Sequence, residues 1–275
     1  MAKTKILFIS QEMSPFLDLT NISKITRQLP QAMQENGCEI RILMPRFGNI
    51  NERRNRLHEV IRLSGMNIVI NENDNPLIIK VASIPTARMQ VYFLDNEEYF
   101  HRKYVFTDAK GKFYNDNDER TIFFCKGAIE TVKKLGWNPD VVHCHGWMSS
   151  LIPMYLKTTY KNDPVYKNAK IVYSVYENDF TEKMSDDFDV KALITDMQAS
   201  DTTILKGASN SDLHKVAIQY SDAVVKGSEN IDPSVEEFIK THQKPMFDFQ
   251  SVEDFKLYST FYEELLQDDL IAAEV

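Results

Sequence analysis

Two histidines separated by one residue form the first pair in the sequence with the spacing of a chemical site. His143 and His145 lie in a short apolar run, and alternate residues of a β-strand point to the same face. Two imidazoles on one face can ligate zinc, which takes four ligands in most protein sites. No third ligand has suitable spacing, so the sequence predicts no metal site and favours a histidine pair packed at a strand end.

Trp147, Glu12 and Tyr176 have the chemistry of a sugar-binding cleft. A tryptophan ring can stack on a sugar, although a tryptophan at a helix start more often packs in a core. Glu12 and Tyr176 either line a cleft or form a buried hydrogen-bonded pair, and both interpretations stay open. Nothing places Glu12 and Glu177 at the separation of a hydrolytic carboxylate pair, so no hydrolase is expected. The remaining acidic cluster favours a solvated face: Glu177, Asp179, Asp186 and Asp187.

Short apolar runs predict the strands that must position these side chains. Buried strands are predicted at residues 6–9, 39–44, 141–143, 170–175 and 223–225. Helical patterns occupy residues 23–36, 118–135, 147–156 and 233–240, and one further helix ends at 217–220. The alternation predicts an α/β fold with a doubly wound, Rossmann-like parallel sheet. Three more strands, at 66–70, 77–82 and 89–94, are interpreted as an antiparallel insertion, and residues 181–212 as a polar surface excursion.

Composition excludes several classes of partner. The chain has 275 residues, with 32 basic against 40 acidic side chains, and a formal net charge of −8. Binding to nucleic acid or to an anionic membrane needs clustered basic charge, so neither partner is expected. Only 9 glycines occur, which disfavours glycine-rich phosphate loops, and no P-loop or G-x-G-x-x-G pattern is present. Three widely spaced cysteines and the lack of an 18-residue apolar run predict a cytoplasmic protein without disulfides or membrane spans.

Several motifs occur in the order and spacing of one enzyme family. They lie at residues 5–17, 41–48, 92–95, 99–102, 114–124 and 139–147. Over residues 3–230 they resemble bacterial glycogen synthases and plant starch synthases, glycosyltransferase family 5. The resemblance includes the family's Ser-Glu-x-x-Pro turn, at Glu12 and Pro15. It implies the N-terminal, acceptor-side domain of a GT-B enzyme that transfers glucose from ADP-glucose to the end of an α-1,4-glucan.

Substitutions within these motifs remove groups that the family uses. The family's Lys-Thr-Gly-Gly-Leu loop, which faces the donor phosphates, reads here as residues 18–22, with Asp18 in place of the lysine. Thr20 and Asn21 stand in place of the two glycines, where the backbone must approach the ligand closely. Gly146 replaces an aspartate, and Tyr176 replaces the histidine that lies beside the transferred glucose. An anion near a diphosphate repels it, so the resemblance implies a weakened donor site.

Further differences affect the rest of the family's site. Met148 replaces the last histidine of the His-x-His-Asp-Trp-His motif, and Glu177 replaces an asparagine. Residues 226–229, Lys-Gly-Ser-Glu, stand where the family has Val-Ser-Pro. The C-terminal domain, which holds most of the nucleotide-sugar site in GT-B enzymes, has no counterpart after residue 230. We therefore expect half of the interdomain active site to be missing.

A helical pattern near the C-terminus has one apolar face. Its members fall at i, i+3, i+6, i+7 and i+10, namely Phe255, Tyr258, Phe261, Tyr262 and Leu265. The segment is either the returning final helix of GT-B enzymes or an unrelated helix that covers an exposed sheet. We predict a Rossmann-like domain at residues 1–230 and a helical tail at 231–275. Residues 252–266 are expected to pack as a helix on that domain, in the same chain or in a dimer mate.

Three functions remain open. The first is a non-catalytic glucan-binding or regulatory protein, a pseudoenzyme. The second is half of an ADP-glucose glucosyltransferase completed by a donor-domain partner, and the third is an interaction protein without sugar chemistry. Candidate partners are an α-glucan or other sugar, a second copy in a homodimer, and the donor-domain subunit; no cofactor is expected. No residue receives a catalytic role, and the ligand-binding candidates are Glu12, Thr20, Asn21, His145, Trp147, Tyr176 and Glu177.

Overall fold

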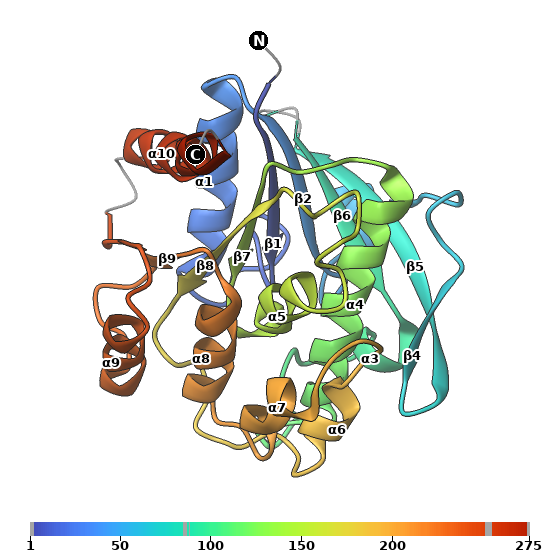
Figure 1. Ribbon diagram of the computed structural model, residues 1–275. Helices are drawn as coiled ribbons and strands as arrows, with labels where there is room; N and C mark the ends of the chain where they lie inside the picture. The colour runs from blue at the N-terminus through green and yellow to red at the C-terminus, as the bar shows by residue number, and fades with distance from the viewer. Residues whose placement is uncertain (1–2, 85–86, 88, 251–254, 274–275) are drawn as a thin grey trace.

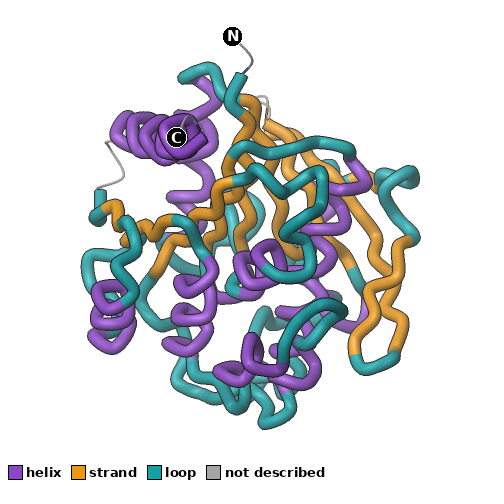
Figure 2. The backbone as a smooth tube through the Cα atoms, viewed as in Figure 1, coloured by secondary structure: helices purple, strands orange, loops and turns teal. Residues whose placement is uncertain are grey.

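A largely parallel sheet of ten strands crosses the molecule (Figures 1 and 2). The computed structural model describes residues 3–84, 87, 89–250 and 255–273, and the side chains of these except 268–273. The strand order is β10-β9-β8-β7-β1-β2-β6-β5-β3, with β4 paired to β5. The parallel strands are β1 (Lys5–Ser10), β2 (Glu39–Pro45), β6 (Met89–Asp95), β7 (Val141–His145), β8 (Lys170–Val175), β9 (Ala223–Lys226) and β10 (Met246–Phe247). The antiparallel strands are β3 (His58–Glu59), β4 (Met66–Ile70) and β5 (Asn73–Ile84).

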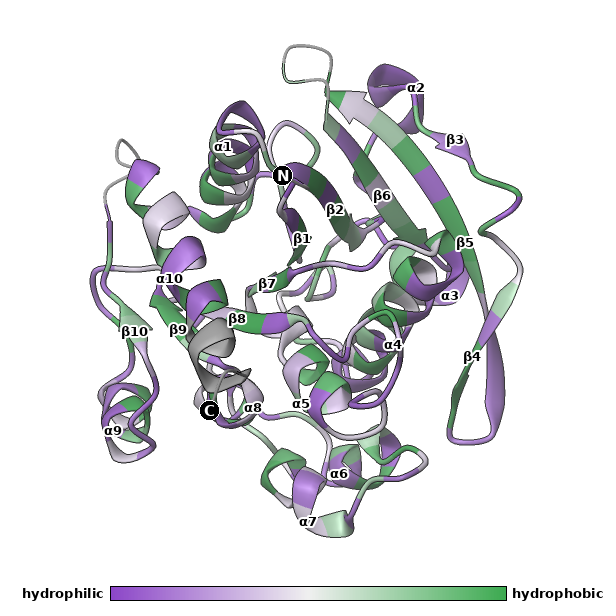
Figure 3. Cartoon of the chain, turned by 45° about the horizontal axis from the view of Figure 1, so that its top comes forward, coloured by the Kyte–Doolittle hydropathy of each residue, from purple (hydrophilic) through white to green (hydrophobic). Residues whose placement is uncertain are grey.

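The central strands are apolar because helices cover both of their faces. Ile6, Leu7, Phe8 and Ile9 of β1 are all buried, as expected for a parallel strand inside a doubly wound sheet. Helices α1 (Ile22–Glu35) and α10 (Lys256–Ala273) lie on one face (Figure 3). The opposite face carries α4 (Asn117–Leu135), α5 (Leu151–Lys157) and α8 (Asn210–Tyr220). The predicted doubly wound α/β arrangement is therefore present.

Shorter helices complete the connections. They are α2 (Glu52–Asn55), α3 (Glu97–Phe100), α6 (Phe188–Ala192), α7 (Ala199–Thr202) and α9 (Pro233–Thr241), with 3₁₀ turns η1 (Trp147–Ser149) and η2 (Thr203–Leu205). The predicted helix over 147–156 is thus divided between η1 and α5. Among the described helices, none is both long and apolar enough to cross a bilayer.

Two expectations about the connections need correction. Strand β6 does not belong to an antiparallel insertion alone, because it also pairs in parallel with β2 and so extends the main sheet. The segment 181–212 is more than a polar surface excursion, since Phe188 and Leu205 are fully buried in it. Lys191 of this segment forms an ion pair of 3.0 Å with the buried carboxylate of Asp118 in α4. That ion pair ties the segment to the helical layer.

Helix α10 covers the part of the sheet that α1 leaves uncovered. Among its described side chains, those of Tyr258, Tyr262 and Leu265 are buried. The rest of the predicted apolar face, Phe255 and Phe261, is half-buried, and residues 252–254 of the predicted helix lie outside the described residues. Strand β10 precedes α10 and pairs with β9, so residues 231–275 supply a strand of the sheet as well as helices. The helix packs on its own chain.

Candidate functional site

A cavity of about 610 Å³ opens beside the carboxyl ends of β1 and β7, the edge where α/β sheets usually bind ligands. We call it the aromatic cavity, after the rings in its wall. Its polar lining includes Gln11, Thr20, Asn49, Lys103, Asp179 and Glu182. Its aromatic lining is Tyr104, Phe106, Phe113, Trp147 and Phe180. Aromatic walls with a few polar groups are typical of sites for small neutral ligands.

Trp147 forms part of the cavity wall but exposes only 1% of its surface. The ring centroids of Phe106 and Phe180 lie 4.8 and 5.1 Å from that of the tryptophan, in tilted and edge-on arrangements. Phe180 also stacks on Phe113 at 4.7 Å. The indole Nε1 is buried and has no hydrogen-bond acceptor among the described residues. Trp147 is therefore packed by its neighbours and retains a free donor.

Glu12 is fully buried and holds the loop that follows β1. Its Oε2 accepts hydrogen bonds from the backbone N–H groups of Leu19 and Thr20, each at 2.8 Å. Its Oε1 accepts one from the Thr20 hydroxyl at 2.7 Å. Three donors occupy this carboxylate, so Glu12 fixes the loop ahead of α1. It does not form the buried pair with Tyr176 that the sequence left open, since its hydrogen-bond partners lie in this loop.

Tyr176 is 4% exposed and bonds to a histidine. Its hydroxyl lies 2.7 Å from His145 Nδ1. Burial raises the pKa of Tyr176 well above its usual value, and the nearby phenol of Tyr258 adds to this effect. Burial also lowers the pKa of His145 to about 3, so the pair is neutral at physiological pH. The phenol stands where the resemblance places the histidine beside the transferred glucose.

The ring of Tyr176 fits only because residue 227 has no side chain. A Cβ at Gly227 would lie 2.5 Å from Cε1 and 2.7 Å from Cζ of Tyr176. These separations are shorter than any stable carbon–carbon contact. Both residues lie where the sequence departs from the family pattern, which has a histidine at 176 and Val-Ser-Pro in place of the Lys-Gly-Ser-Glu segment. The tyrosine is thus accommodated by its surroundings.

Gln11 and Gly146 also depend on each other, because the side chain of one fits only where the other has none. Gly146 has φ +80°, and a Cβ there would lie 2.5 Å from Gln11 Oε1. The Gln11 side chain occupies the space over the glycine and donates to Asp179 Oδ2 at 3.0 Å. Aligned on Glu12 and Pro15, Gln11 takes the place of the serine in the Ser-Glu-x-x-Pro turn. Compared with the family pattern, residue 11 is larger and residue 146 is smaller, so the Gln11 side chain fills the space that a side chain at 146 would need at this edge of the cavity.

Asp179 brings a carboxylate to the cavity mouth from the loop after β8. The residue is exposed, but its carboxylate faces Gln11. Removal of this carboxylate from water, together with the charges of Glu12 and Glu177, raises the pKa of Asp179 to about 6. Asp179 therefore bears a negative charge above that pH and can accept hydrogen bonds from a ligand.

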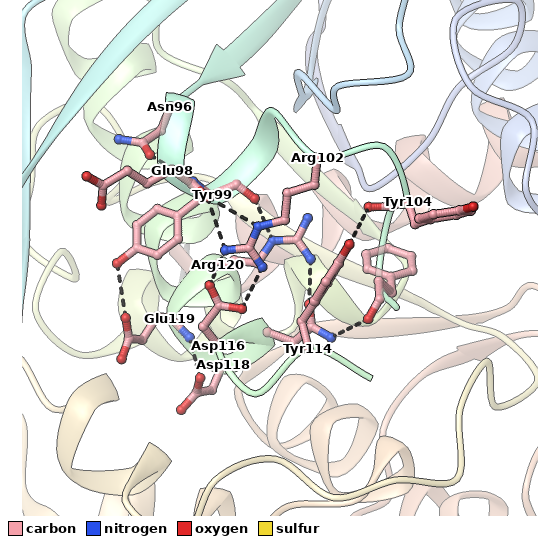
Figure 4. Close-up of polar contacts among 12 residues, drawn as sticks. Asn96, Glu98, Tyr99, Arg102, Tyr104, Tyr114, Asp116, Asp118, Glu119 and Arg120 are labelled. Atoms are coloured by element: carbon pink, nitrogen blue, oxygen red, sulfur yellow. Dashed lines mark hydrogen bonds and ion pairs between the residues drawn. The ribbon is translucent and has the colours of Figure 1, made fainter. Parts of the chain in front are cut away.

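Two arginines make polar contacts on either side of the segment that supplies residues 103–107 of the cavity lining (Figure 4). Arg120 is fully buried and donates from Nε to the Tyr99 carbonyl at 2.8 Å. Its guanidinium lies 5.5–6.0 Å from four ring centroids, those of Phe47, Phe100, Phe106 and Tyr114. Arg102 forms a two-pronged ion pair with Asp116, at 2.8 and 2.5 Å. These contacts hold the segment 103–113, of which residues 103–107 and 113 line the cavity.

Hydroxyl groups form hydrogen bonds with ring nitrogens of the two buried histidines. The ring centroids of His143 and His145 are 4.0 Å apart. His143 contacts the Tyr262 hydroxyl through Nδ1 at 2.6 Å and the Ser174 hydroxyl through Nε2 at 2.7 Å. No group of three or more potential metal ligands is found in the described part of the chain. Both ring nitrogens of His143 are therefore engaged in packing contacts.

The predicted site residues lie in the aromatic cavity, in a smaller neighbouring cavity, behind the walls of these cavities, or on an exposed loop. Thr20 and Trp147 reach the aromatic cavity. A smaller cavity of about 170 Å³ adjoins it and is lined by Thr20, Asn21, Tyr176 and Glu177, together with Asp179. Glu12 and His145 are buried behind these walls. Asp18 lies exposed on the loop between β1 and α1.

Much of the wall of the aromatic cavity is not predicted by the sequence. Phe113, Phe180 and Tyr104 lie in loops without periodicity, and no single-sequence signal brings them together. Gln11 could have been identified from the sequence, because it directly precedes Glu12 in the segment that resembles the Ser-Glu-x-x-Pro turn. Arg120 could also have been identified, since it lies in the part of the chain where the resemblance is strongest.

The chain is similar to known proteins in sequence and in fold. Residues 5–241 match the family described as the starch synthase catalytic domain. Over 173 residues the chain is 43% identical to a glycogen synthase of Chlorobium luteolum and 42% identical to one of Chlorobium phaeobacteroides. Each match covers 62% of this chain and 35% of the relative.

A solved structure has the same fold. The catalytic domain of starch synthase IV from Arabidopsis thaliana, bound to ADP and acarbose, aligns with a TM-score of 0.74 at 16% identity. The alignment covers 91% of this chain and 52% of that chain, and it confirms the predicted fold. This chain spans about a third of the length of the curated relatives it matches, 35% in each case. The resemblance inferred from the motifs is confirmed, and the chain belongs to the starch synthase catalytic domain family.

Proposed function

We propose that the chain binds an α-glucan or a related neutral sugar in the aromatic cavity and does not transfer glucose by itself. The observation that carries the proposal is Tyr176, whose phenol is buried against His145 and Gly227 where the family pattern has a histidine. The role that follows is glucan binding or regulation by a domain of the glycogen and starch synthase type.

The cavity wall supports sugar binding. At about 610 Å³ it has room for several sugar units of an oligosaccharide. Tyr104 is 40% exposed and offers a ring face for stacking on a pyranose. The exposed Lys103 ammonium can donate to a sugar hydroxyl, and the Asp179 carboxylate can accept from one. A lining that offers both donors and acceptors suits a hydroxyl-rich ligand.

The substitutions argue against transfer. Asp18 replaces a lysine that the resemblance places at the donor phosphates, which turns an attraction into a repulsion. The Tyr176 phenol is held by His145 and has a strongly raised pKa, so it is neutral and leaves no imidazole at that place. Loss of one preorganised electrostatic contact costs about 10²–10³ in turnover in well-studied enzymes. Several such losses together remove nearly all catalysis.

A binding experiment tests the sugar proposal. Calorimetric titration with maltoheptaose should give a Kd of about 1 mM or tighter, with cellohexaose as a control for the linkage. Phe180→Ala removes a ring from the cavity wall and should weaken binding at least fivefold. Phe238→Ala is the matched control, because Phe238 is also half-buried but lies in α9, outside the cavity lining. Absence of binding, or equal binding by the Phe180 variant, would contradict the proposal.

A transfer assay separates the alternatives. The purified chain should not incorporate labelled glucose from ADP-glucose into glycogen, and its Kd for ADP should be about 1 mM or weaker. Incorporation that requires a second, donor-domain protein would instead support the half-transferase. Failure to bind any glucan, with no incorporation, would favour an interaction protein without sugar chemistry.

A further inference from the structure

A second cavity, also of about 610 Å³, lies on the other side of the loop between β1 and α1. We call it the arginine cavity. Three separate segments build it: the loop after β1, the turn between α2 and β3, and the end of β5. Its principal lining residues are Phe16, Arg54, Arg56, His58, Ser83 and Ile84. It shares no lining residue with the aromatic cavity.

The charged lining of this cavity has one sign. Arg54 and Arg56 line it, and no described aspartate or glutamate does. Within the described residues, the guanidinium groups of Arg54 and Arg56 make no hydrogen bond or ion pair. The nearby carboxylate of Glu52 is already paired, with Arg46 and with Lys80. The chain has a net charge of −8, but the lining of this cavity carries two positive guanidinium groups and no negative group from the described residues.

The other lining groups complete the chemistry of the hollow. The exposed Ser83 offers a hydroxyl, which can donate to an oxyanion. Phe16 and Ile84 are mostly buried and give the cavity an apolar base. Guanidinium forks match the oxygens of a phosphate, and an apolar base suits the body of an organic ligand. Because both features occur in one hollow, the ligand should carry both a phosphate and a ring.

We propose that the arginine cavity binds a small phosphorylated organic molecule, with its phosphate at Arg54 and Arg56 and its ring on Phe16 and Ile84. This site is separate from the proposed sugar site, and it stands whether or not the aromatic cavity binds a glucan. Its affinity depends on salt, because the two guanidiniums are exposed to solvent.

Phenyl phosphate is a suitable probe because it joins a phosphate to one aromatic ring. Titration followed by amide chemical shifts of the full chain should show binding at least tenfold tighter for phenyl phosphate than for benzyl alcohol, its uncharged counterpart. Binding of phenyl phosphate should also be tighter than that of inorganic phosphate. The shifts should fall in residues 54–58 and 83–84, and the affinity should fall when salt is raised from 50 to 300 mM.

Charge-matched variants complete the test. Arg54→Ala with Arg56→Ala should weaken phenyl phosphate binding at least tenfold. Arg53→Ala with Arg62→Ala removes the same charge from exposed arginines that do not line the cavity, and its affinity should stay within twofold of the parent. Both double variants change exposed side chains, so the fold should persist, as circular dichroism will check. Equal loss in both double variants, or no advantage over benzyl alcohol, overturns the proposal.

Discussion

The hydroxyl of Tyr262 in α10 lies 2.6 Å from Nδ1 of His143, a fully buried residue of β7 that is 119 positions earlier in the chain. This contact fixes the last helix over the centre of the sheet. The other nitrogen of His143 contacts Ser174 in β8. One histidine thus joins two neighbouring strands to the helix that covers them.

Tyr262→Phe should lower stability by about 1–3 kcal/mol, because it leaves a buried imidazole nitrogen without its partner. Urea denaturation of the variant and the parent measures the difference. Tyr104→Phe is the control, since Tyr104 is 40% exposed and the same change there should cost less than about 0.5 kcal/mol. Equal stability of the Tyr262 variant and the parent would mean that the hydroxyl contact contributes nothing.

Deletion of residues 246–275 should destabilise the chain strongly. The deletion exposes the sheet face that Tyr258, Tyr262 and Leu265 cover, and it removes the edge strand β10. We expect a lower melting temperature by several degrees or aggregation, which an exposed apolar patch promotes. Thermal denaturation and size-exclusion chromatography test this. A truncated protein that melts like the parent and stays monodisperse would refute our proposal that the tail is part of the domain.

Gly227→Ala should cost about 1–3 kcal/mol, because its Cβ would lie 2.5 Å from the Tyr176 ring. The cost should largely disappear when Tyr176 is replaced by alanine. Denaturation of the parent, both single variants and the double variant forms a mutant cycle whose coupling energy isolates this contact. The lost Tyr176–His145 bond is common to both tyrosine variants and cancels. Strictly additive effects would show that the two residues do not constrain each other.

Stability should decline as pH falls below about 6.5. Burial lowers the pKa of His145 to about 3 and of His214 to about 4, and it lowers that of His143 well below the usual value. In the unfolded chain these groups titrate near 6.5. Between the folded and unfolded pKa values the unfolded state binds more protons, so stability is complete above 6.5 and is lost toward acid. Each histidine contributes up to about 1.4 kcal/mol per pH unit.

A histidine variant measures this pH dependence. His214→Asn should reduce the slope of unfolding free energy against pH, between about pH 4.5 and 6, by about one proton. Gln28→Ala is the control, because Gln28 is exposed and carries no titratable group, so its removal should leave the slope unchanged. Unchanged slopes for both variants would show that the buried histidine does not govern acid stability.

Local patterns were sufficient to predict most elements. Strand β1 reads as a continuous apolar run, and the stripe that includes Tyr258 and Leu265 gave the C-terminal helix. The partners of elements were harder to predict. The pairing of β6 with β2 depends on the packing of the whole sheet. Lys191 meets Asp118 across 73 positions, so residues 181–212 looked more exposed than they are.

Residue type alone could not place the candidate site residues in three dimensions. Glu12 and His145 have the chemistry of a binding site, but both are buried: Glu12 is bound by the loop that directly follows it, and His145 by Tyr176 at the end of β8. Trp147 lies in the cavity wall, and its packing against Phe106 and Phe180 comes from two loops that no pattern connects. Conversely, the fit of Gln11 over Gly146 requires coordinates, because neither residue alone suggests it.

The loop between β1 and α1 is a wall common to the aromatic cavity and the arginine cavity. Phe16 lines the arginine cavity, whereas Leu19 and Thr20 line the aromatic cavity. Glu12 holds Leu19 and Thr20, and Met13 forms a bridge with Leu17, so this short segment is constrained along its length. If occupancy on one side shifts the segment, the two ligands become heterotropic effectors of each other. Thermodynamic linkage then makes the effect reciprocal: each ligand changes the affinity for the other by the same factor.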